Sequence, residues 1–312
     1  MNKKKEVSDT FIIARHVLTF LESQDISSNS RYTYRGALEQ FCSWIEKKGF
    51  TDLTRETILQ YKSWLDKKNL SSFTKAIYLV VVRRFFSWTE EENIFPNIAR
   101  GIKGVRRQLK SHQKDSLSTD AVKKLLHSID TNTLMGKRDF ALINMLIRTG
   151  LRLKELMTAT LFDLQKDRDQ ILLWVHGKGR SGKDDFVVLT PEVLEPLECY
   201  LQQRIMKTKD EYLFVSLSDR NYGKKITTQS LSRIIKKRLR DVGINSRRIT
   251  AHSLRHTFGV LAMQAGASLY EVQLAMRHTA STTTQLYLGD IERIKRLEGS
   301  PERKISKLLS GL

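Results

Sequence analysis

The chain has 312 residues, which is enough for two ordinary domains that each bury a hydrophobic core. Hydrophobic residues make up 40 % of it and charged residues 28 %, as in most soluble globular proteins. There are 54 lysines and arginines against 34 aspartates and glutamates, and the formal net charge of +20 predicts a polyanionic partner. Nucleic acid is the first candidate, because neutralised phosphates supply most non-specific affinity. An anionic membrane surface is the alternative, but the sequence contains no long apolar run and no concentrated basic amphipathic tail.

The two cysteines, Cys42 and Cys199, are too few for a disulfide framework or a zinc site. The first eleven residues are charged and contain no apolar region of signal-peptide length. We therefore expect a cytoplasmic protein.

Residues 9–100 contain four helical patterns separated by polar breaks. The second opens after Ser28-Ser30, the third at Thr54 and the fourth at Ser71-Ser72. The aromatic residues of these patterns are expected in the core: Trp44, Trp64, Phe85 and Trp88. Five cationic residues lie off the apolar stripes and are predicted to contact DNA phosphates: Arg31, Arg35, Lys75, Arg83 and Arg84. For any one of them the alternative is a charge on a solvated face.

Residues 100–116 combine two glycines with many cations and have no apolar stripe, which predicts a linker between domains. Its charge, including Arg106 and Arg107, predicts that it lies along DNA. Ser118-Thr119-Asp120 then caps a new helix. The predicted division is a helical DNA-binding domain at 1–107, a linker at 108–117 and a second domain at 118–312.

The second domain is predicted to be mainly helical with one β-hairpin. The apolar runs Ile171–Val175 and Phe186–Leu189 flank a glycine-rich loop, and helical patterns resume after Pro191. The loop fits most of a nucleotide-binding P-loop, G-x-x-x-x-G-K, but Asp184 stands where that motif needs Ser or Thr. A strand pattern follows, whereas a P-loop must open a helix. We therefore interpret the loop as a hairpin tip that presents Lys178.

Three segments carry the residues that chemistry needs. Arg152 falls just past the end of an apolar helix at Gly150. His252 and Arg255 are at i and i+3, so both project from one face of a helix. The third segment contains His278 and Tyr287.

Cleaving a phosphodiester without a metal requires guanidinium groups on the phosphate oxygens, a nucleophile other than water and an acid for the leaving oxygen. Two arginines, one or two histidines and the tyrosine of these segments, together with the hairpin lysine, supply all three, and no suitably spaced pair of carboxylates points to a two-metal nuclease. Taken singly, each residue has an ordinary alternative: a surface ion pair for Arg152, a structural hydrogen bond for the histidines, and half-buried packing for Tyr287. Their joint spacing favours chemistry.

That joint pattern resembles the tyrosine recombinase (phage integrase) family and its small Xer-like members. Thr149-Gly150-Leu151-Arg152 with Glu155-Leu156 is similar to the family's T-G-[LM]-R-x-x-E-[LI] segment. Residues 252–258 match its H-x-L-R-H-[ST]-F box without a mismatch. His278 follows Arg255 by 23 positions and Tyr287 follows His278 by nine, as in small members of the family.

The resemblance implies a role for each site residue. Arg152 and Arg255 would clamp the scissile phosphate, and Tyr287 would attack it, with no metal and no cofactor. His252 and His278 would hydrogen-bond the phosphate or manage the proton of the tyrosine. Lys178 would protonate the 5′ oxygen, and Glu155 would support the arginines without taking part in the chemistry.

The sequence departs from the family in two places. Met276-Arg277-His278 stands where L-G-H is common, so an arginine replaces a glycine. The hairpin tip is longer and more acidic than the usual G-K-G-x-K-x-R, which makes Lys183 the second candidate for the lysine role.

The resemblance also implies an architecture and partners. Two domains would form a C-shaped clamp around a short palindromic DNA duplex, and four protomers would exchange strands through a Holliday junction. An apolar stripe near the C-terminus would dock on the neighbouring protomer, the alternative being an intramolecular cap or a frayed end: Ile305, Leu308, Leu309 and Leu312. A partner recombinase or accessory factor is possible, and no membrane is involved. The other functions considered are a monomeric type IB topoisomerase-like enzyme and a DNA-binding regulator that has lost catalysis.

Overall fold

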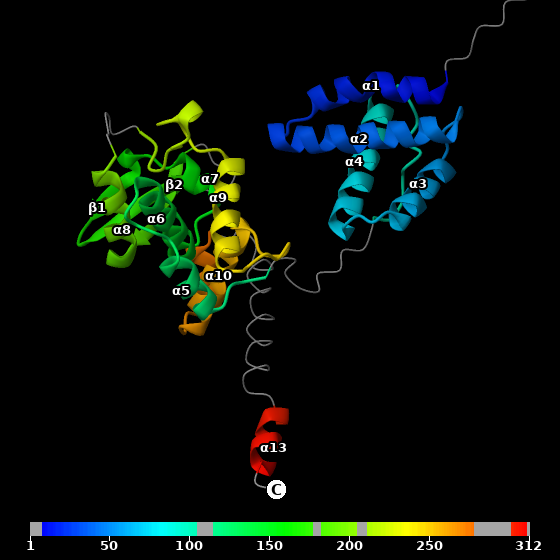
Figure 1. Ribbon diagram of the computed structural model, residues 1–312. Helices are drawn as coiled ribbons and strands as arrows, with labels where there is room; N and C mark the ends of the chain where they lie inside the picture. The colour runs from blue at the N-terminus through cyan, green and yellow to red at the C-terminus, as the bar shows by residue number, and fades with distance from the viewer. Residues whose placement is uncertain (1–7, 105–114, 177–181, 205–210, 278–300, 311–312) are drawn as a thin grey trace, which may run out of the picture. The chain divides into compact units, whose positions relative to one another are not determined.

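The computed structural model describes residues 8–104, 115–176, 182–204, 211–277 and 301–310 (Figure 1). The chain divides into two compact units, Met1–Lys110 and Ser111–Leu312. Both are mainly helical, and a small antiparallel sheet lies in the second unit, which confirms the predicted fold class. No helix in these ranges is long and apolar enough to cross a lipid bilayer.

The first unit consists of helices that begin at polar caps. Ser27 and Ser71 accept hydrogen bonds from the backbone amides of Ser30 and Thr74, and Thr54 forms a capping box with Thr57. The second helix thus begins slightly earlier than the sequence predicted, because Ser27 is the serine that serves as its cap. The helices are α1 (Asp9–Ser23), α2 (Ser28–Lys48), α3 (Arg55–Lys67) and α4 (Ser72–Glu91).

Aromatic side chains form the core of the first unit. Phe41 and Tyr61 meet edge to face, with their ring centroids 4.9 Å apart, and both are fully buried. The predicted core residues Trp44, Phe85 and Trp88 are buried, whereas Trp64 is only partly buried and packs at the edge of this core. Its indole ring there supports the ammonium group of a lysine on the solvent side.

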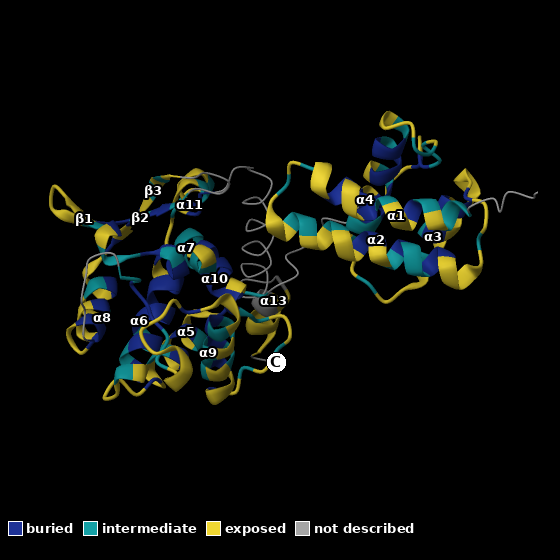
Figure 2. Ribbon diagram, turned by 90° about the horizontal axis from the view of Figure 1, so that it is seen from above, coloured by how far each residue is buried: buried dark blue, intermediate teal, exposed yellow. Residues whose placement is uncertain are grey.

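Helix α6 (Leu134–Thr149) runs through the centre of the second unit and is buried along most of its length (Figure 2). It packs against α8 and α10 and also contacts α5, α9 and β3. The other helices in the described part of this unit are α5 (Thr119–His127), α7 (Leu153–Thr158), α8 (Pro191–Gln202), α9 (Thr228–Asp241), α10 (Ala251–Gln264), α11 (Leu269–Ala275) and α13 (Pro301–Leu309), with the short 3₁₀ turns η1 (Leu161–Asp163) and η2 (Asp219–Asn221). As predicted, Ser118 caps α5, and its side chain accepts from the Ala121 amide.

The sheet has the order β1-β2-β3, with β1 (Leu164–Asp167), β2 (Gln170–His176) and β3 (Lys183–Leu189) all antiparallel. Strands β2 and β3 form the predicted hairpin, with Trp174 opposite Phe186. The sequence analysis did not predict β1, because most of its side chains are polar and exposed. Strand β3 follows the glycine-rich loop directly, whereas a P-loop would require a helix at this point. Residues 177–181, with Lys178, lie outside the described residues.

Candidate active site

Arg152 is held at the start of a helix that follows the end of α6. Gly150 adopts φ +62°, a conformation that favours glycine, and its amide donates to the Leu146 carbonyl to end the helix. Arg152 is the N-cap of α7 and its backbone amide donates to Glu155 Oε2 at 2.7 Å. Its guanidinium donates to Glu155 Oε1 at 2.6 Å. Glu155 therefore fixes both the backbone and the side chain of Arg152.

Arg255 is buried on α10 and joins two distant segments of chain. Its guanidinium donates to the carbonyl oxygens of Gly150 and Met276. The side chain is 3 % exposed, so few of its rotamers remain accessible. The predicted partner residue His252 lies one turn earlier on the same helix and is exposed at its first turn. The structure thus brings Arg255 to the helix break that precedes Arg152, and the role of the two arginines as a clamp on phosphate stays a prediction.

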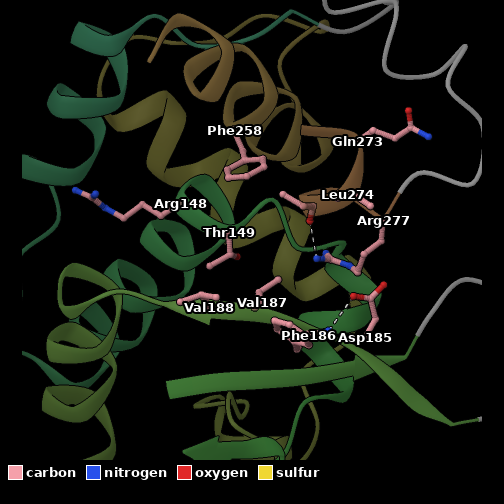
Figure 3. Close-up of a pocket in the computed structure, with 11 residues that line it drawn as sticks. Arg148, Thr149, Asp185, Phe186, Val187, Val188, Phe258, Gln273, Leu274 and Arg277 are labelled. Atoms are coloured by element: carbon pink, nitrogen blue, oxygen red, sulfur yellow. Dashed lines mark hydrogen bonds between the residues drawn. The ribbon is translucent and has the colours of Figure 1, made fainter. Parts of the chain in front are cut away.

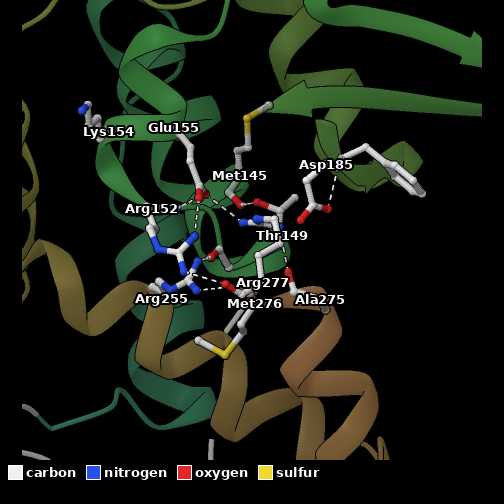
Figure 4. Close-up of polar contacts among 12 residues, drawn as sticks. Met145, Thr149, Arg152, Lys154, Glu155, Asp185, Arg255, Ala275, Met276 and Arg277 are labelled. Carbon is white, nitrogen blue, oxygen red and sulfur yellow. Dashed lines mark hydrogen bonds and ion pairs between the residues drawn. The ribbon is translucent and has the colours of Figure 1, made fainter. Parts of the chain in front are cut away.

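A third arginine belongs to this cluster, and the sequence analysis noted it only as a departure from the family pattern. Arg277 donates from Nη2 to Glu155 Oε2 at 2.8 Å and from Nη1 to the Ala275 carbonyl at 2.7 Å. Its own carbonyl oxygen accepts from Arg152 Nη2 at 2.8 Å. Figure 4 shows the guanidinium groups of Arg152 and Arg277 at the Glu155 carboxylate, with that of Arg255 nearby at the Met276 carbonyl. Only the replacement of a glycine by a cation next to a histidine pointed to it in the sequence.

The charge of Glu155 is stabilised by these contacts. Burial by itself raises the pKa of this carboxyl, but the positive charge of Arg277 and the hydrogen bonds from Arg152 and Arg277 outweigh burial and hold the pKa below its ordinary value. With three guanidinium groups and one carboxylate, the cluster keeps an excess of positive charge that suits a phosphate. Arg152 is its most accessible member, because its side chain is 25 % exposed while that of Arg277 is 3 % exposed.

Lys183, the second candidate for the lysine role, is engaged elsewhere. Its ammonium group forms an ion pair with the buried carboxylate of Asp163, next to the start of β1. A lysine that is held in such an ion pair is not placed to donate a proton to a leaving group. This contact favours Lys178 over Lys183 for the role of acid.

Several predicted site residues fall outside the described residues. They are His278 and Tyr287 of the third segment, Lys178 of the hairpin tip, and Arg106 and Arg107 of the linker. Their roles stay predictions. Across the rest of the chain, no group of three or more histidine, cysteine, aspartate or glutamate side chains is arranged to hold a metal ion.

The predicted DNA-contacting residues of the first unit differ in what they already contact. Arg31 donates to the Gln24 carbonyl at 3.3 Å, and Lys75 donates to the Asp66 carbonyl at 2.8 Å. Arg84 donates to the Tyr34 hydroxyl at 2.6 Å. Arg35 is exposed on α2 and Arg83 is half-buried on α4. All five thus keep at least part of the side chain at the surface, and their role in DNA binding stays a prediction.

A cavity of about 510 Å³ adjoins the arginine cluster and shares Arg277 with it (Figure 3). Its apolar side is formed by β3, α10 and α11, where Phe186, Val188 and Leu274 are 46 %, 42 % and 56 % exposed. Neither Arg152 nor Arg255 lines it. The cavity is therefore a neighbouring recess and not the place where the arginines would hold a phosphate.

Comparison with known proteins agrees with this geometry. Residues 115–292 match the phage integrase family, and residues 13–94 match the N-terminal SAM-like domain of phage integrases. The chain belongs to the phage integrase family, the family of tyrosine recombinases. The reaction of this family is the cleavage and rejoining of DNA strands, and the chain is an enzyme of that class.

Curated relatives extend over nearly the whole chain. The tyrosine recombinase XerD of Proteus mirabilis is 30 % identical over 289 residues, which cover 89 % of this chain and 90 % of the relative. The tyrosine recombinase XerD of Listeria monocytogenes is 28 % identical over 281 residues, covering 84 % and 88 %. These relatives support a role in site-specific DNA recombination.

Solved structures show the same fold. The XerH site-specific recombinase bound to its palindromic difH substrate, in a post-cleavage complex, aligns with a TM-score of 0.73 at 20 % identity and covers 93 % of this chain and 85 % of that one. A lambda integrase dimer bound to a core site aligns with a TM-score of 0.66 at 13 % identity, covering 88 % and 97 %.

Proposed function

We propose that the chain recombines a specific DNA site by metal-independent transesterification, with Tyr287 as the nucleophile. The observation that carries this proposal is the arrangement of Arg152 and Arg255. Arg255 holds the carbonyls of Gly150 and Met276, and Arg152 holds that of Arg277, so both guanidinium groups are positioned before DNA binds. Such preorganised cations stabilise the charge that develops on the phosphate oxygens in the transition state.

The bonds and protons of the reaction balance without a cofactor. The Tyr287 oxygen forms a bond to the scissile phosphorus and the bond to the 5′ oxygen breaks, which leaves a 3′-phosphotyrosyl linkage and a 5′-hydroxyl. The phenol loses its proton, with His252 and His278 as candidates to manage it, and Lys178 supplies a proton to the 5′ oxygen. The covalent linkage stores the energy of the broken bond, so a 5′-hydroxyl from another strand rejoins the DNA without ATP.

The assembly that we propose is a tetramer on two copies of a short, roughly palindromic duplex. Residues 1–107 and 118–312 would close as a C-shaped clamp on each half-site, with the linker at 108–117 along the DNA, and strands would be exchanged in pairs through a Holliday junction. The exposed apolar residues of α13, Ile305, Leu308 and Leu309, support docking of this tail on a neighbouring protomer, since exposed apolar groups on one helix favour a protein contact. A cytoplasmic location, and a partner recombinase or accessory factor, belong to the same proposal.

The decisive experiment traps the covalent intermediate. The chain is incubated without divalent metal on a nicked suicide duplex that carries a candidate recombination site, next to the Tyr287→Phe variant, and the products are separated on a denaturing gel. We expect a slower band of protein-linked DNA that the variant does not form. Cleavage only after magnesium is added would refute the mechanism, and DNA binding without cleavage under any condition would favour the regulator.

A further inference from the structure

Arg277 occupies a backbone conformation that is unfavourable for its residue type. Its φ is +52°, in the left-handed region, where a side chain with a Cβ is strained and glycine is not. The other non-glycine residues with positive φ in the described ranges, Asn93 and Arg168, lie in exposed turns. Arg277 is instead buried, and its Nε has no hydrogen-bond partner. Both features cost stability, so contacts elsewhere in the side chain must offset them.

Those contacts converge on the support of Arg152. Glu155 Oε1 accepts only from the Arg152 guanidinium among the contacts resolved here, whereas Oε2 accepts from the Arg152 amide and from Arg277 Nη2. Arg277 also returns to Arg152 through the backbone, because its carbonyl accepts from Arg152 Nη2. The two arginines are thus linked twice, once through the carboxylate and once directly (Figure 4).

Removing the charge of Arg277 would change how the Arg152 guanidinium is held. Without Arg277, the buried Glu155 would keep Arg152 as its remaining cationic partner, and the Arg152 guanidinium would be drawn toward the carboxylate and away from a phosphate. With Arg277 present, a second guanidinium group neutralises the carboxylate at Oε2. Arg152 can then share its donors between Glu155, the Arg277 carbonyl and a ligand.

We propose that Arg277 is a positioning residue that acts through Glu155 to hold the Arg152 guanidinium in place for the scissile phosphate. This role rests on the function proposed above. It concerns the rate of cleavage and not the affinity for DNA, because the Arg277 side chain is buried and meets Glu155 and a backbone carbonyl.

The test compares single-turnover rates of covalent complex formation at saturating protein on the suicide duplex. Arg277→Met keeps the length of the side chain and the backbone strain but removes the charge. We expect its rate to fall roughly ten- to a hundredfold with DNA affinity changed less than about twofold. Arg277→Lys restores a charge and should recover part of the loss. Arg168→Met is the matched control, since Arg168 has the same φ of 52° and is exposed in the turn between β1 and β2.

Arg277→Gly separates strain from charge. Glycine relieves the left-handed backbone, so this variant should melt at or above the temperature of Arg277→Met, yet cleave as slowly. A purely structural role predicts the opposite result, in which the rate recovers together with the stability. If Arg277→Met does not fold, the comparison of Arg277→Gly with Arg277→Lys still decides between the two.

A double-mutant cycle tests the path through Glu155. In a Glu155→Gln background the further change Arg277→Met should slow cleavage less than about threefold, because the carboxylate that links the two arginines is already gone. An equal loss in both backgrounds would overturn the proposal. If the unchanged chain forms covalent complex and Arg277→Met is just as fast, only this role fails. If the unchanged chain forms none, the function proposed above fails and this role with it.

Discussion

Glu155 is a buried carboxylate between two guanidinium groups, and its ionisation contributes to folding as well as to the site. The pKa of this group is held below its ordinary value of 4.5 in the folded chain. A lowered pKa means that the ionised group stabilises the fold fully above its ordinary pKa, and that this contribution is lost as the pH falls through the lowered value.

We expect Glu155→Gln to reduce the free energy of unfolding by roughly 3 kcal/mol at neutral pH, because Arg277 would stay buried without its anion. The difference from the unchanged chain should shrink as the pH falls below 4.5 and through the lowered pKa of the carboxylate. Urea unfolding of both chains at neutral pH and at acidic pH measures this difference in the free energy of unfolding. The exposed Glu22→Gln serves as control and should change stability by less than about 0.5 kcal/mol. A difference that does not depend on pH would contradict the account of Glu155.

The site could be predicted from the sequence where a short motif carries its own geometry. A glycine after an apolar helix predicts the break before Arg152, and a helical spacing of three puts His252 and Arg255 on one helix. The role of Arg277 was beyond such reasoning. Its partner Glu155 lies 122 positions away, and a left-handed φ at an arginine leaves no trace in the residue pattern.

At the scale of elements, the junction between α6 and α10 determines how closely the two arginine segments approach. Gly150 ends α6, and a Cβ placed on it would lie 2.4 Å from the ring of Phe258 on α10. The Gly150 carbonyl accepts from Arg255 next to this contact. A side chain there would push the helices apart at the point where the arginines converge.

Gly150→Ala should therefore lower the free energy of unfolding by about 2–4 kcal/mol, from backbone strain together with the clash against Phe258. Gly223→Ala is the matched comparison, because Gly223 also has a positive φ but nothing lies within 4 Å of an added Cβ. That variant should lose only about 1 kcal/mol. Thermal unfolding of both variants measures the cost of the clash as the difference between their losses of stability. Equal losses would show that the Phe258 ring moves to accommodate the added methyl group.

Elements with a strong apolar period were predictable, and those without one were not. The helices of the first unit and the hairpin of β2 and β3 follow from their patterns. Strand β1 has no such pattern, since Gln165, Lys166 and Asp167 are all exposed. It forms because its backbone pairs with that of β2. Tertiary pairing of this kind is not encoded in a local window of residues.

At the scale of the whole molecule, each unit has a hydrophobic core of its own. The formal net charge of the full sequence is +20. This charge predicts how DNA binding responds to salt. Each neutralised phosphate releases counterions, so the logarithm of the association constant falls linearly with the logarithm of the salt concentration.

We expect the DNA affinity of the chain to fall by about 10³- to 10⁵-fold between 50 and 200 mM salt, as for proteins with several phosphate contacts. Fluorescence anisotropy with a labelled duplex measures the slope. Arg35→Ala should reduce the magnitude of that slope by about 1 if the exposed Arg35 contacts a phosphate. A flat salt dependence would exclude an electrostatic interface, and an unchanged slope would remove Arg35 from it.

The three-stranded sheet has a further consequence for how copies of the chain meet in concentrated solution. Strand β3 is an edge strand, and unpaired edges tend to add strands from other molecules. It begins with three charged residues, Lys183, Asp184 and Asp185, before its apolar part. A second copy pairing antiparallel along this edge would have to accommodate those charges against its own apolar residues. The edge therefore discourages fibrillar association between copies of the chain.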